Sequence, residues 1–529
     1  MLADPRRARI AAWLLLILGM AFCRGAYLEN VIYNIDEAEY AVAADALDHG
    51  WLPGVDLLGS TKPPGIAVLY NLLFHIFGRS LAVIHVAHLV IIIFAGALAA
   101  EIAGAVWEPK AILPAALLFW MASNSFAMPD EILALNVESP GVALALVAIW
   151  LVWKKARARW AVMGSGMALG GAILFRQSFV FFAIPAVYAI FNRWRWRGLI
   201  RTALGLALVW IPVLLVYALR GGLSWPLDSW IRYPLTYAAD LGWSGFLEAF
   251  WRTTVEFSQQ EFVPLLLAMV GLLAIWRDRR APRGKFVLLL LVASVLALTS
   301  GSRFFGHYWI QLFPAVALLG VAGWIWLAER TKVGRRVLLA LVIFGALLAL
   351  RHFPLWREWD PWAAPAGFSP YALGQSEADK TLGQFAASHT KPSETIVVWG
   401  YCPQIYYHAH RLPGVRDYLC HYTTGYSPAT FSPNAARPSR AFGHPRAPEL
   451  FVEDLKQRHP KYILDIAPIR DYEFPFFQYP MRSYLPIADF VRSNYLPETS
   501  VAGALIYRLR TPADSTLDVS PQYESSELQ

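Results

Sequence analysis

Residues 81–105 read LAVIHVAHLVIIIFAGALAAEIAGA, an apolar run in which Glu101 is the one Asp, Glu, Lys or Arg. A helix needs about 20 such residues to cross the hydrocarbon core of a bilayer. The rest of the chain agrees, since 57% of its 529 residues are hydrophobic, 16% are charged and the mean hydropathy is +0.40. Soluble domains carry about 25% charged residues. The sequence therefore predicts a polytopic α-helical membrane protein and excludes a soluble enzyme.

Runs of this kind recur along the first two thirds of the chain. Two of them, 161–175 and 178–192, are short and are separated only by Arg176 and Gln177. Lys and Arg clusters flank this pair on both ends, so two crossings must lie between the clusters if both clusters are cytoplasmic. We therefore predict a helical hairpin with Arg176 at its outer tip. In all, about 11 transmembrane helices are predicted, near 11–28, 81–105, 111–127, 138–153, 161–175, 178–192, 201–219, 261–276, 285–300, 307–328 and 335–352.

The basic residues set the predicted orientation of these helices. Placing the clusters in the cytoplasm satisfies the positive-inside rule, and it puts the N-terminus inside and the C-terminal domain outside. One more crossing at residues 64–78 would move the following basic clusters to the outer side. We therefore predict that these residues form an interfacial helix on the outer face instead of a span. The clusters lie near 6–9, 110, 154–159, 193–201, 277–285 and 330–336.

The formal net charge of +8 and the pI near 9.3 would suit a nucleic-acid-binding protein. Here, however, the Lys and Arg fall in short clusters between apolar runs, which indicates membrane topology. No G-x-G-x-x-G follows a predicted strand, and there is no P-loop. We therefore expect no nucleic-acid partner and no nucleotide-binding fold.

The composition changes after Phe353. Residues 354–392 are rich in Pro, Trp and polar side chains, and alternating strand and helix patterns follow. Such alternation is typical of a small α/β domain. The predicted strands are 395–399, 462–466 and 502–509, and the predicted helices are 403–410, 448–458 and 483–493.

Three segments follow from this pattern. We predict a transmembrane module over 1–353, an extracytoplasmic α/β domain over 354–510 and a disordered tail over 511–529. Cys402 and Cys420 lie in the predicted α/β domain. The sequence leaves open whether they form a disulfide in an oxidising compartment or stay as free thiols.

Acids gather in the loops that are predicted to lie outside. From Asp36 to Leu47 the spacing predicts a short amphipathic helix with Tyr40 on one face. We expect the two loops to form a catalytic carboxylate cluster. The alternative is that negative outer loops merely follow membrane topology, but Asp and Glu contribute little to orientation, so this alternative explains only the shortage of Lys and Arg. Residues 29–63 carry Asp36, Glu37, Glu39, Asp45, Asp48 and Asp56 against one base, Lys62, and residues 128–138 carry Asp130, Glu131 and Glu138.

Four short motifs occur in order along the helical part: Asp36-Glu37-Ala38-Glu39-Tyr40, Lys62-Pro63-Pro64-Gly65, Asn136-Val137-Glu138, and RFFGHYWIQLFP over 303–314. Together they resemble the GT-C class of polyprenyl-phosphate-sugar-dependent glycosyltransferases, which includes protein O-mannosyltransferase-like and lipid A aminoarabinose transferase-like enzymes. IVVWG over 396–400, followed by Tyr406, is similar to the start of the outer domain in bacterial members. Thr61 departs from an acid found in some members, and Arg176 stands where relatives often have Lys.

The resemblance implies a GT-C type fold and an inverting transfer of a sugar from a polyprenyl-phosphate donor to a hydroxyl acceptor on the outer face. A carboxylate at the water interface can serve as the general base, and cations can stabilise the departing phosphate. We expect catalytic roles for Asp36 as the base and for Glu37 and Glu138, acceptor positioning by Tyr40, Asp130 and Asn136, and phosphate binding by Lys62, Arg176, Arg303, His307 and Tyr308.

Other interpretations stay open at this point. A glycan ligase or polymerase would use a lipid-diphosphate donor instead. A transporter would place charges near the middle of the membrane, whereas the predicted span interiors are nearly free of charge. The acceptor is a lipid, a glycan or a protein, and no ligand spacing specifies the divalent metal that the acids would allow. The composition, without a eukaryotic retention signal, favours a bacterial inner membrane.

Overall fold

The computed structural model of the chain describes residues 4–59, 61–124, 129–154, 158–277, 281–330, 332–350, 376–426, 442–470 and 476–516. These residues form two compact units, one running to Ser376 and the other beginning at Glu377. The predicted domain boundary at 353/354 lies outside the described residues.

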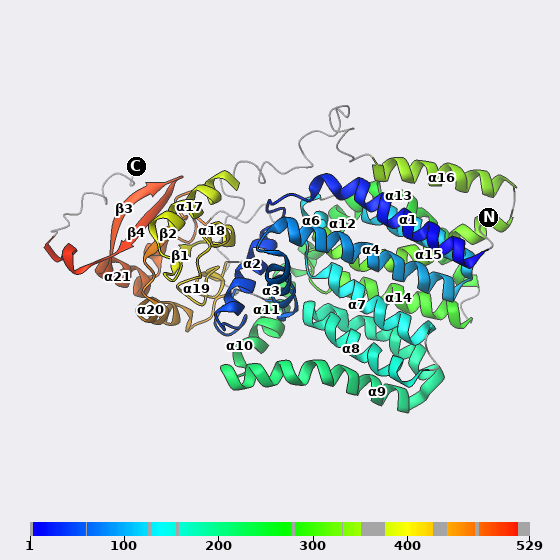
Figure 1. The fold of residues 1–529 in the computed structure, drawn as a ribbon, viewed down its shortest axis with the longest axis horizontal. Helices are drawn as coiled ribbons and strands as arrows, with labels where there is room; N and C mark the ends of the chain where they lie inside the picture. The colour runs from blue at the N-terminus through cyan, green and yellow to red at the C-terminus, as the bar shows by residue number, and fades with distance from the viewer. Residues whose placement is uncertain are drawn as a thin grey trace. The chain divides into compact units, whose positions relative to one another are not determined.

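The first unit is helical, and each predicted span corresponds to a helix or to half of one (Figure 1). Six of the described helices, or seven if one bent pair counts as a span, are long and apolar enough to cross a membrane. The prediction of a polytopic membrane protein is therefore confirmed. The helices that correspond to the predicted spans, of which α5, α7 and α8 are too short to count among those six or seven, are α1 (Pro5–Arg24), α4 (Leu81–Val106), α5 (Ile112–Ser123), α7 (Glu138–Lys154), α8 (Arg159–Phe175), α9 (Ala183–Arg220), α13 (Phe262–Arg277), α14 (Pro282–Thr299), α15 (Phe313–Arg330) and α16 (Lys332–Leu350).

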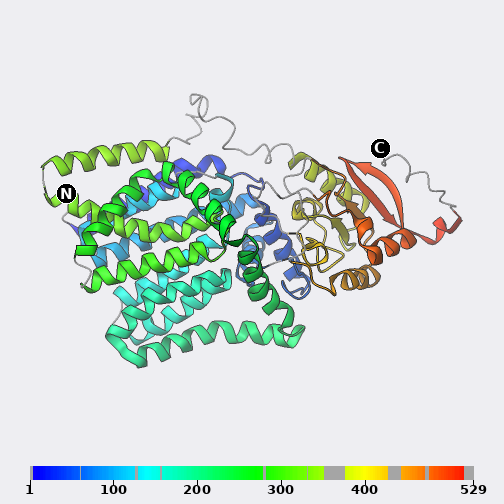
Figure 2. The same cartoon turned by 180° about the vertical axis from the view of Figure 1, so that it is seen from behind.

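Helix α9 takes up two of the predicted runs. It is kinked at Arg195, whose φ of +50° lies outside the helical region, inside one of the basic clusters. Its two halves correspond to the predicted spans at 178–192 and 201–219, and the second half lies beside α8 in both views (Figure 2). Close packing elsewhere depends on small residues, because a Cβ at Gly271 in α13 would collide with the carbonyl oxygen of Leu319 in α15.

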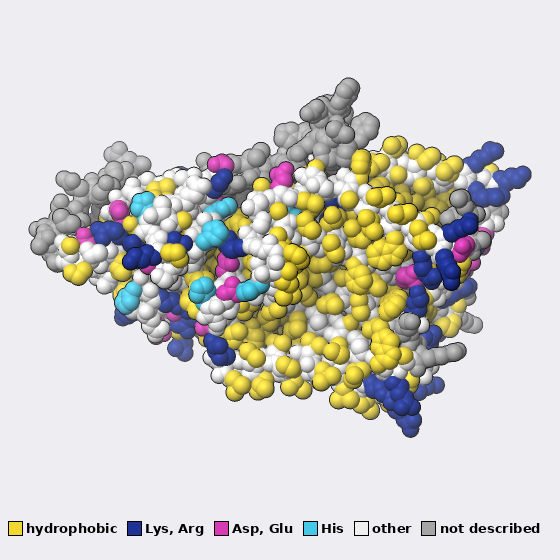
Figure 3. Space-filling view, viewed as in Figure 1, with side chains coloured by type: hydrophobic (Ala, Val, Ile, Leu, Met, Phe, Trp, Pro, Cys, Tyr) yellow, Lys and Arg dark blue, Asp and Glu magenta, His cyan; other side chains and the backbone are white. Residues whose placement is uncertain are grey.

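Ion pairs gather at one end of this helical unit. Glu101 of α4 lies 2.6 Å from Arg9 of α1 and also pairs with Lys154 at the end of α7. This acid, the deepest that the sequence places in a span, thus joins three helices at the end that we predict to be cytoplasmic. Figure 3 shows apolar side chains spread over the helices, with Lys and Arg near the end that carries the N-terminus.

Three segments outside the spans shape the opposite end. α2 (Ile35–Asp48) confirms the predicted helix, but residues on all of its sides are buried, so it is not amphipathic as predicted. α3 (Gly65–Phe77) covers most of the predicted interfacial segment. Its 13 residues are too short to span a bilayer. The third segment was not predicted: it contains α10 (Ser224–Leu227), the π-helix η4 (Asp228–Arg232), α11 (Tyr233–Asp240) and α12 (Gly242–Gln260).

Helix α12 is the longest element of this third segment. Phe246 and Phe250 pack on Phe304, while Trp243 and Trp251 are exposed. Its aromatic and aliphatic residues form one stripe along the helix, and Glu248, Arg252 and Glu256 lie on the opposite side. α12 is therefore an amphipathic helix, and this period is present in the sequence. α12 and α13 are bent by 103° to each other.

The second unit is a small α/β domain with a four-stranded sheet in the order β1-β2-β4-β3. β1 (Ile396–Trp399) and β2 (Tyr462–Asp465) are parallel, whereas β4 (Ala504–Leu509) is antiparallel to both β2 and β3 (Tyr495–Val501). The helices around it are α17 (Ser376–His389), α18 (Pro403–Ala409), α19 (His421–Thr424), α20 (Ala447–Arg458) and α21 (Leu485–Asn494).

Two elements of this unit and one boundary differ from the prediction. α17 and β3 were not predicted, since α17 follows a Pro- and Trp-rich stretch and β3 (YLPETSV) contains a Pro and few β-formers. The predicted disordered tail is wrong for residues 511–516, because Pro512–Thr516 form a 3-10 helix in which Asp514 pairs with Arg508 at 3.0 Å. Residues 517–529 lie outside the described part.

Both cysteines of this unit are free thiols. Cys402 donates to Asp379 at 3.2 Å, and Cys420 donates to the carbonyl oxygen of Val398. The two thiols therefore have separate acceptors, which answers the question of a disulfide in favour of free thiols.

Candidate active site

Asp36 lies in the first turn of α2, where a capping box fixes the helix start. The side chain of Asn34 accepts a hydrogen bond from the amide of Asp36 at 3.0 Å, and Glu37 bonds back to the amide of Asn34. Such caps define where a helix begins. One turn later, the hydroxyl of Tyr40 donates to Oδ2 of Asp36 at 3.0 Å. The i, i+4 spacing thus holds the Asp36 carboxylate in one orientation.

Lys62 pairs with the same carboxylate oxygen. Its Nζ lies 2.8 Å from Oδ2 of Asp36 and 4.8 Å from the centroid of the Tyr40 ring. Burial alone would raise the pKa of the Asp36 carboxyl, but the charge of Lys62, helped by that of His307, lowers it below its ordinary value. Oδ1 of Asp36 receives no hydrogen bond from any described residue. Asp36 is therefore held as a carboxylate with one open acceptor oxygen.

The motif around Lys62 brings it beside the tip of the α8–α9 hairpin. α3 begins at Gly65, directly after Pro63 and Pro64. A Cβ on Gly65 would lie 2.6 Å from the carbonyl oxygen of Leu174, near the end of α8. Only glycine permits this approach, so the sequence Lys-Pro-Pro-Gly docks the start of α3 two residues from Arg176.

Arg176 and Glu138 form a second buried pair. The Arg176 guanidinium donates to Oε1 of Glu138 and lies 3.7 Å from the centroid of the Tyr308 ring. Glu138 is fully buried at the start of α7, and its Oε2 accepts no hydrogen bond from the described residues. As with Asp36, one oxygen faces a cation; the other oxygen of Glu138 is buried and accepts no hydrogen bond from the described residues.

His307 completes the group from the segment η5 (Gly306–Leu312), which leads into α15. Its Nδ1 lies 2.6 Å from Oε2 of Glu131, and its Nε2 lies 4.0 Å from Oε1 of Glu138. The backbone amide of His307 also donates to Glu131 at 3.3 Å. The predicted meeting of the two acidic loops with the 303–314 motif is therefore seen in the structure.

Arg303, which was predicted to bind the donor phosphate at the outer face, is fully buried. Positive φ angles at Ser302 and Phe304 turn the chain on both sides of it. Its guanidinium donates to the carbonyl oxygen of Tyr237 at 3.0 Å and lies 3.4 Å from Asp240. Arg303 thus binds α11.

Two further predicted residues, Glu37 and Asn136, lie elsewhere. Glu37 points away from Lys62 and is bound by other groups, and Asn136 is buried with its amide 3.4 Å from the carbonyl oxygen of Glu131. The side chain of Asp130 lies outside the described residues. Sequence reasoning did not assign roles to Glu131 or to Tyr237, and the signal for Glu131 was its place beside Asp130 in the same acidic loop.

The group of Asp36, Tyr40, Lys62, Glu138, Arg176, His307 and Tyr308 is called the polar cluster below. Its acids alternate with Lys62, Arg176 and His307, so a cation or an imidazole faces each carboxylate. Among the residues that the structure describes, no three His, Cys, Asp or Glu side chains are arranged to hold a metal ion. The chemistry that these residues themselves offer is proton transfer at a carboxylate and anion binding by Lys62 and Arg176.

Residues 61–219 match a family described as dolichyl-phosphate-mannose-protein mannosyltransferase. The match contains Lys62, Glu138 and Arg176. No curated protein sequence matches the chain.

Two solved structures resemble the whole chain. ArnT from Cupriavidus metallidurans, bound to undecaprenyl phosphate, matches with a TM-score of 0.59 and 14% identity over 94% of this chain and 97% of that one. The chain has the GT-C fold. AglB from Archaeoglobus fulgidus, an archaeal oligosaccharyltransferase in complex with an inhibitory peptide and a dolichol-phosphate, matches with a TM-score of 0.53 and 12% identity over 97% and 75%. Both are GT-C glycosyltransferases, so the fold class implied by the four motifs is confirmed for this chain.

Proposed function

We propose that this GT-C protein is an inverting glycosyltransferase that moves a sugar from a polyprenyl-phosphate donor to a hydroxyl acceptor. The observation that carries the proposal is the paired arrangement of Asp36 with Lys62 and of Glu138 with Arg176, each acid keeping one oxygen that accepts no hydrogen bond from the described residues. The ArnT structure holds undecaprenyl phosphate, and the AglB structure holds a dolichol-phosphate. Both ligands belong to the proposed donor chemistry.

The open oxygen of Asp36 takes the proton in the proposed reaction. The acceptor hydroxyl attacks the anomeric carbon of the donor sugar, a new C–O bond forms, and the bond from that carbon to the phosphate oxygen breaks. Oδ1 of Asp36 accepts the hydroxyl proton, and polyprenyl phosphate leaves. A single displacement inverts the anomeric carbon. Positioned proton transfer of this type contributes about 10²–10⁴-fold to rate.

Lys62 and Arg176 stabilise the negative charge of the departing phosphate. Each contacts a carboxylate of the polar cluster in the free protein, and the phosphate takes over part of that contact when the donor binds. Charge-assisted hydrogen bonds of this kind contribute about 1.5–3 kcal/mol each. His307 and Tyr308 line the same place, and Arg303 supports it indirectly by holding Tyr237.

We place this site on the outer face of a bacterial inner membrane, because the basic ends around Arg9 and Lys154 lie at the other end of the helices (Figure 3). Cysteines at exposed Asp48 and Arg159 test this side assignment. An impermeant thiol reagent added to intact cells is expected to label position 48 and not position 159. The reverse pattern would move the reaction to the cytoplasmic face.

The donor test uses the purified full chain in lipid nanodiscs. Undecaprenyl-monophosphate sugars, undecaprenyl-diphosphate sugars and UDP- or GDP-sugars are offered separately with lipid, glycan and peptide acceptors. We expect free undecaprenyl phosphate to appear only with the monophosphate donors and an acceptor. Release of the diphosphate lipid would show a ligase instead, and turnover of a nucleotide sugar would overturn the donor assignment.

A further inference from the structure

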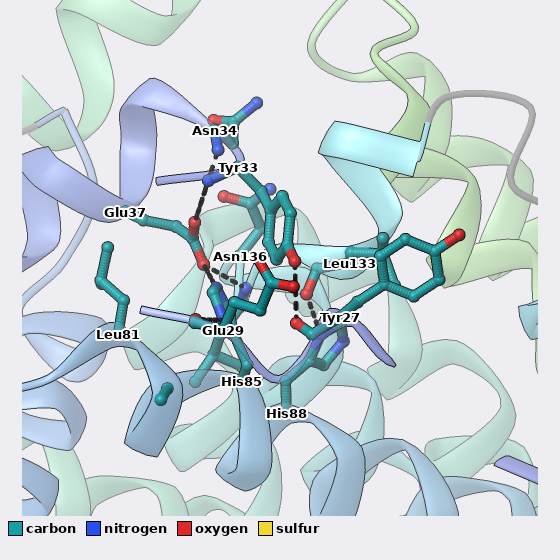
Figure 4. Close-up of polar contacts among 12 residues, drawn as sticks. Tyr27, Glu29, Tyr33, Asn34, Glu37, Leu81, His85, His88, Leu133 and Asn136 are labelled. Atoms are coloured by element: carbon teal, nitrogen blue, oxygen red, sulfur yellow. Dashed lines mark hydrogen bonds and ion pairs between the residues drawn. The ribbon is translucent and has the colours of Figure 1, made fainter. Parts of the chain in front are cut away.

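Glu37 is surrounded by hydrogen-bond donors (Figure 4). Its Oε2 accepts from the amides of Tyr33 at 2.9 Å and Asn34 at 3.4 Å, and its Oε1 lies 3.1 Å from Nε2 of His85 and 3.2 Å from the amide of Leu135. An ionised carboxyl group offers about four acceptor sites, whereas an amide offers two acceptor sites and two donors. Only a carboxylate satisfies all four donors at once.

His85 of α4 carries the opposite charge. Its Nδ1 lies 2.8 Å from the carbonyl oxygen of Glu29, and its Nε2 faces Glu37. Both partners are acceptors, so both ring nitrogens must donate and the imidazole holds two protons. The side chains of Glu37 and His85 are 0% and 2% exposed. The chain thus contains a buried ion pair adjacent to the polar cluster and separate from its cations.

This pair holds the segment that leads to Glu138. Leu135 lies three residues before Glu138; its amide donates to Glu37 and its carbonyl oxygen accepts from the hydroxyl of Tyr70 in α3 at 2.9 Å. His88 of α4 faces the carbonyl oxygen of Leu133 at 2.9 Å and the hydroxyl of Ser139 at 2.8 Å. The residues before and after Glu138 are therefore tied to α2, α3 and α4.

We propose that Glu37 is a positioning residue that sets the distance between Asp36 and Glu138 by binding Leu135 and His85. Asp36 is its neighbour on α2, and Lys62 lies three residues before α3. The two helices that hold Leu135 therefore also position the base and one phosphate ligand. The inference rests on the proposed function for its effect on catalysis, and it replaces the direct catalytic role that the motif implied for Glu37.

Substitution Glu37→Gln tests the proposal because it keeps the size of the side chain and removes its capacity to accept four bonds. We expect kcat to fall by up to about tenfold, because misplacing Glu138 costs no more than losing it, with KM for the lipid donor unchanged. In a Glu138→Gln background the same substitution is expected to lower kcat less than about twofold, because the residue that it positions is already lost. Multiplicative losses in the double variant would overturn the proposal.

Asp45→Asn is the matched control. It also replaces a carboxylate of α2 that is bound to a cation, Arg79 at 2.7 Å, but no described contact joins it to residues 132–139. We expect this variant to keep the wild-type kcat. A loss equal to that of Glu37→Gln would attribute the effect to general destabilisation of α2 and contradict the proposal.

Hydrogen exchange measured by mass spectrometry gives a readout that needs no activity. Glu37→Gln is expected to raise exchange in peptides covering residues 132–139, and Asp45→Asn is not. Unchanged exchange there would overturn the positioning role. A wild-type protein that transfers no sugar from any donor would refute the proposed function alone, because the exchange result would still decide whether Glu37 holds this segment.

Tyr70→Phe covers the case in which Glu37→Gln does not fold. It removes the hydroxyl that binds the carbonyl oxygen of Leu135 and keeps the ring, which packs against Tyr40. We expect faster exchange over residues 132–139 and a smaller fall in kcat that disappears in the Glu138→Gln background. Wild-type exchange over this segment would contradict the proposal.

Discussion

Asp36 and Glu37 are neighbours in one helical turn, yet their surroundings differ in every respect that matters for chemistry. Asp36 is bound through one oxygen by Lys62 and Tyr40 and keeps the other oxygen open, with 16% of its side chain exposed. Glu37 is fully buried and receives donors from four residues. Successive helical residues point about 100° apart, so one acid faces the polar cluster and the other faces the protein interior.

The difference teaches how to separate a reactive acid from a structural one. A carboxylate with all its lone pairs taken has no site for a substrate proton, whereas an ionised carboxylate with an open oxygen does. Burial alone does not decide between them. The number of hydrogen-bond donors and the identity of the neighbouring cation separate a reactive acid from a structural one. Each prediction below changes one of these features.

The largest effect is expected for Asp36→Asn, which removes the proton acceptor and leaves the shape of the side chain. Transfer should fall about 10²–10⁴-fold, the usual contribution of a general base. The abundance and melting temperature of the variant should match the wild type. Turnover assays with the monophosphate donor measure the loss, and near-normal transfer would remove Asp36 from the mechanism.

Lys62→Gln is expected to slow transfer by about one to two decades, since it removes one charge-assisted contact to the phosphate. Burial raises the pKa of the Asp36 carboxyl and the charge of Lys62 lowers it, so the pKa rises when Lys62 is removed. The base must be deprotonated, and the acid limb of kcat/KM therefore moves to higher pH in the variant. A pH–rate profile with the limb at the wild-type position would show that Lys62 does not control the charge of Asp36.

Glu138→Gln should be milder than Asp36→Asn, with a loss of about tenfold, because the amide oxygen still accepts from Arg176 while the charge pair is lost. The buried Arg176 then lacks its counter-charge, so the melting temperature should fall as well. A loss as large as that of Asp36→Asn would instead indicate that Glu138 is the base.

Asp417 of the second unit shows how burial changes the pKa of a carboxyl group when no cation lowers it. The amides of Tyr422 and Thr423 donate to it at 3.3 and 2.7 Å, and burial raises its pKa from 3.8 to about 6. Because the folded pKa exceeds the unfolded one, the contribution to stability is present below pH 3.8 and is lost as the pH rises towards 6. The size is roughly 3 kcal/mol at 1.36 kcal/mol per pH unit.

Thermal unfolding of the full chain between pH 4 and pH 7 measures this slope for the second unit. In Asp417→Asn the slope is expected to disappear, while sugar transfer at pH 7 stays at the wild-type rate. A slope that persists in the variant would assign it to another group.

Much of the fold could be predicted from the sequence because its strongest signals are local. The run at 81–105 and the basic clusters predict the helices, and the capping residues around Asp36 mark the start of α2. β3 has a weak local pattern, which contacts with β4 offset, whereas the amphipathic stripe of α12 is a local signal that was missed.

The candidate site shows the same limit. The motifs identify which residues gather, but not which way each one points. The burial of Arg303 depends on positive φ angles at Ser302 and Phe304, and the role of Glu37 depends on an amide almost 100 residues away, at Leu135. Neither feature has a signature within a short stretch of sequence.

The most direct test of the account is an experimental structure of the Asp36→Asn variant with an undecaprenyl-monophosphate sugar bound. We predict that the phosphate lies within hydrogen-bond distance of Lys62 Nζ and the Arg176 guanidinium, with the anomeric carbon facing the position of Oδ1 on residue 36. Glu37 should keep its contacts to His85 and Leu135 in that complex. A donor phosphate bound away from Lys62 and Arg176 would contradict the central claim.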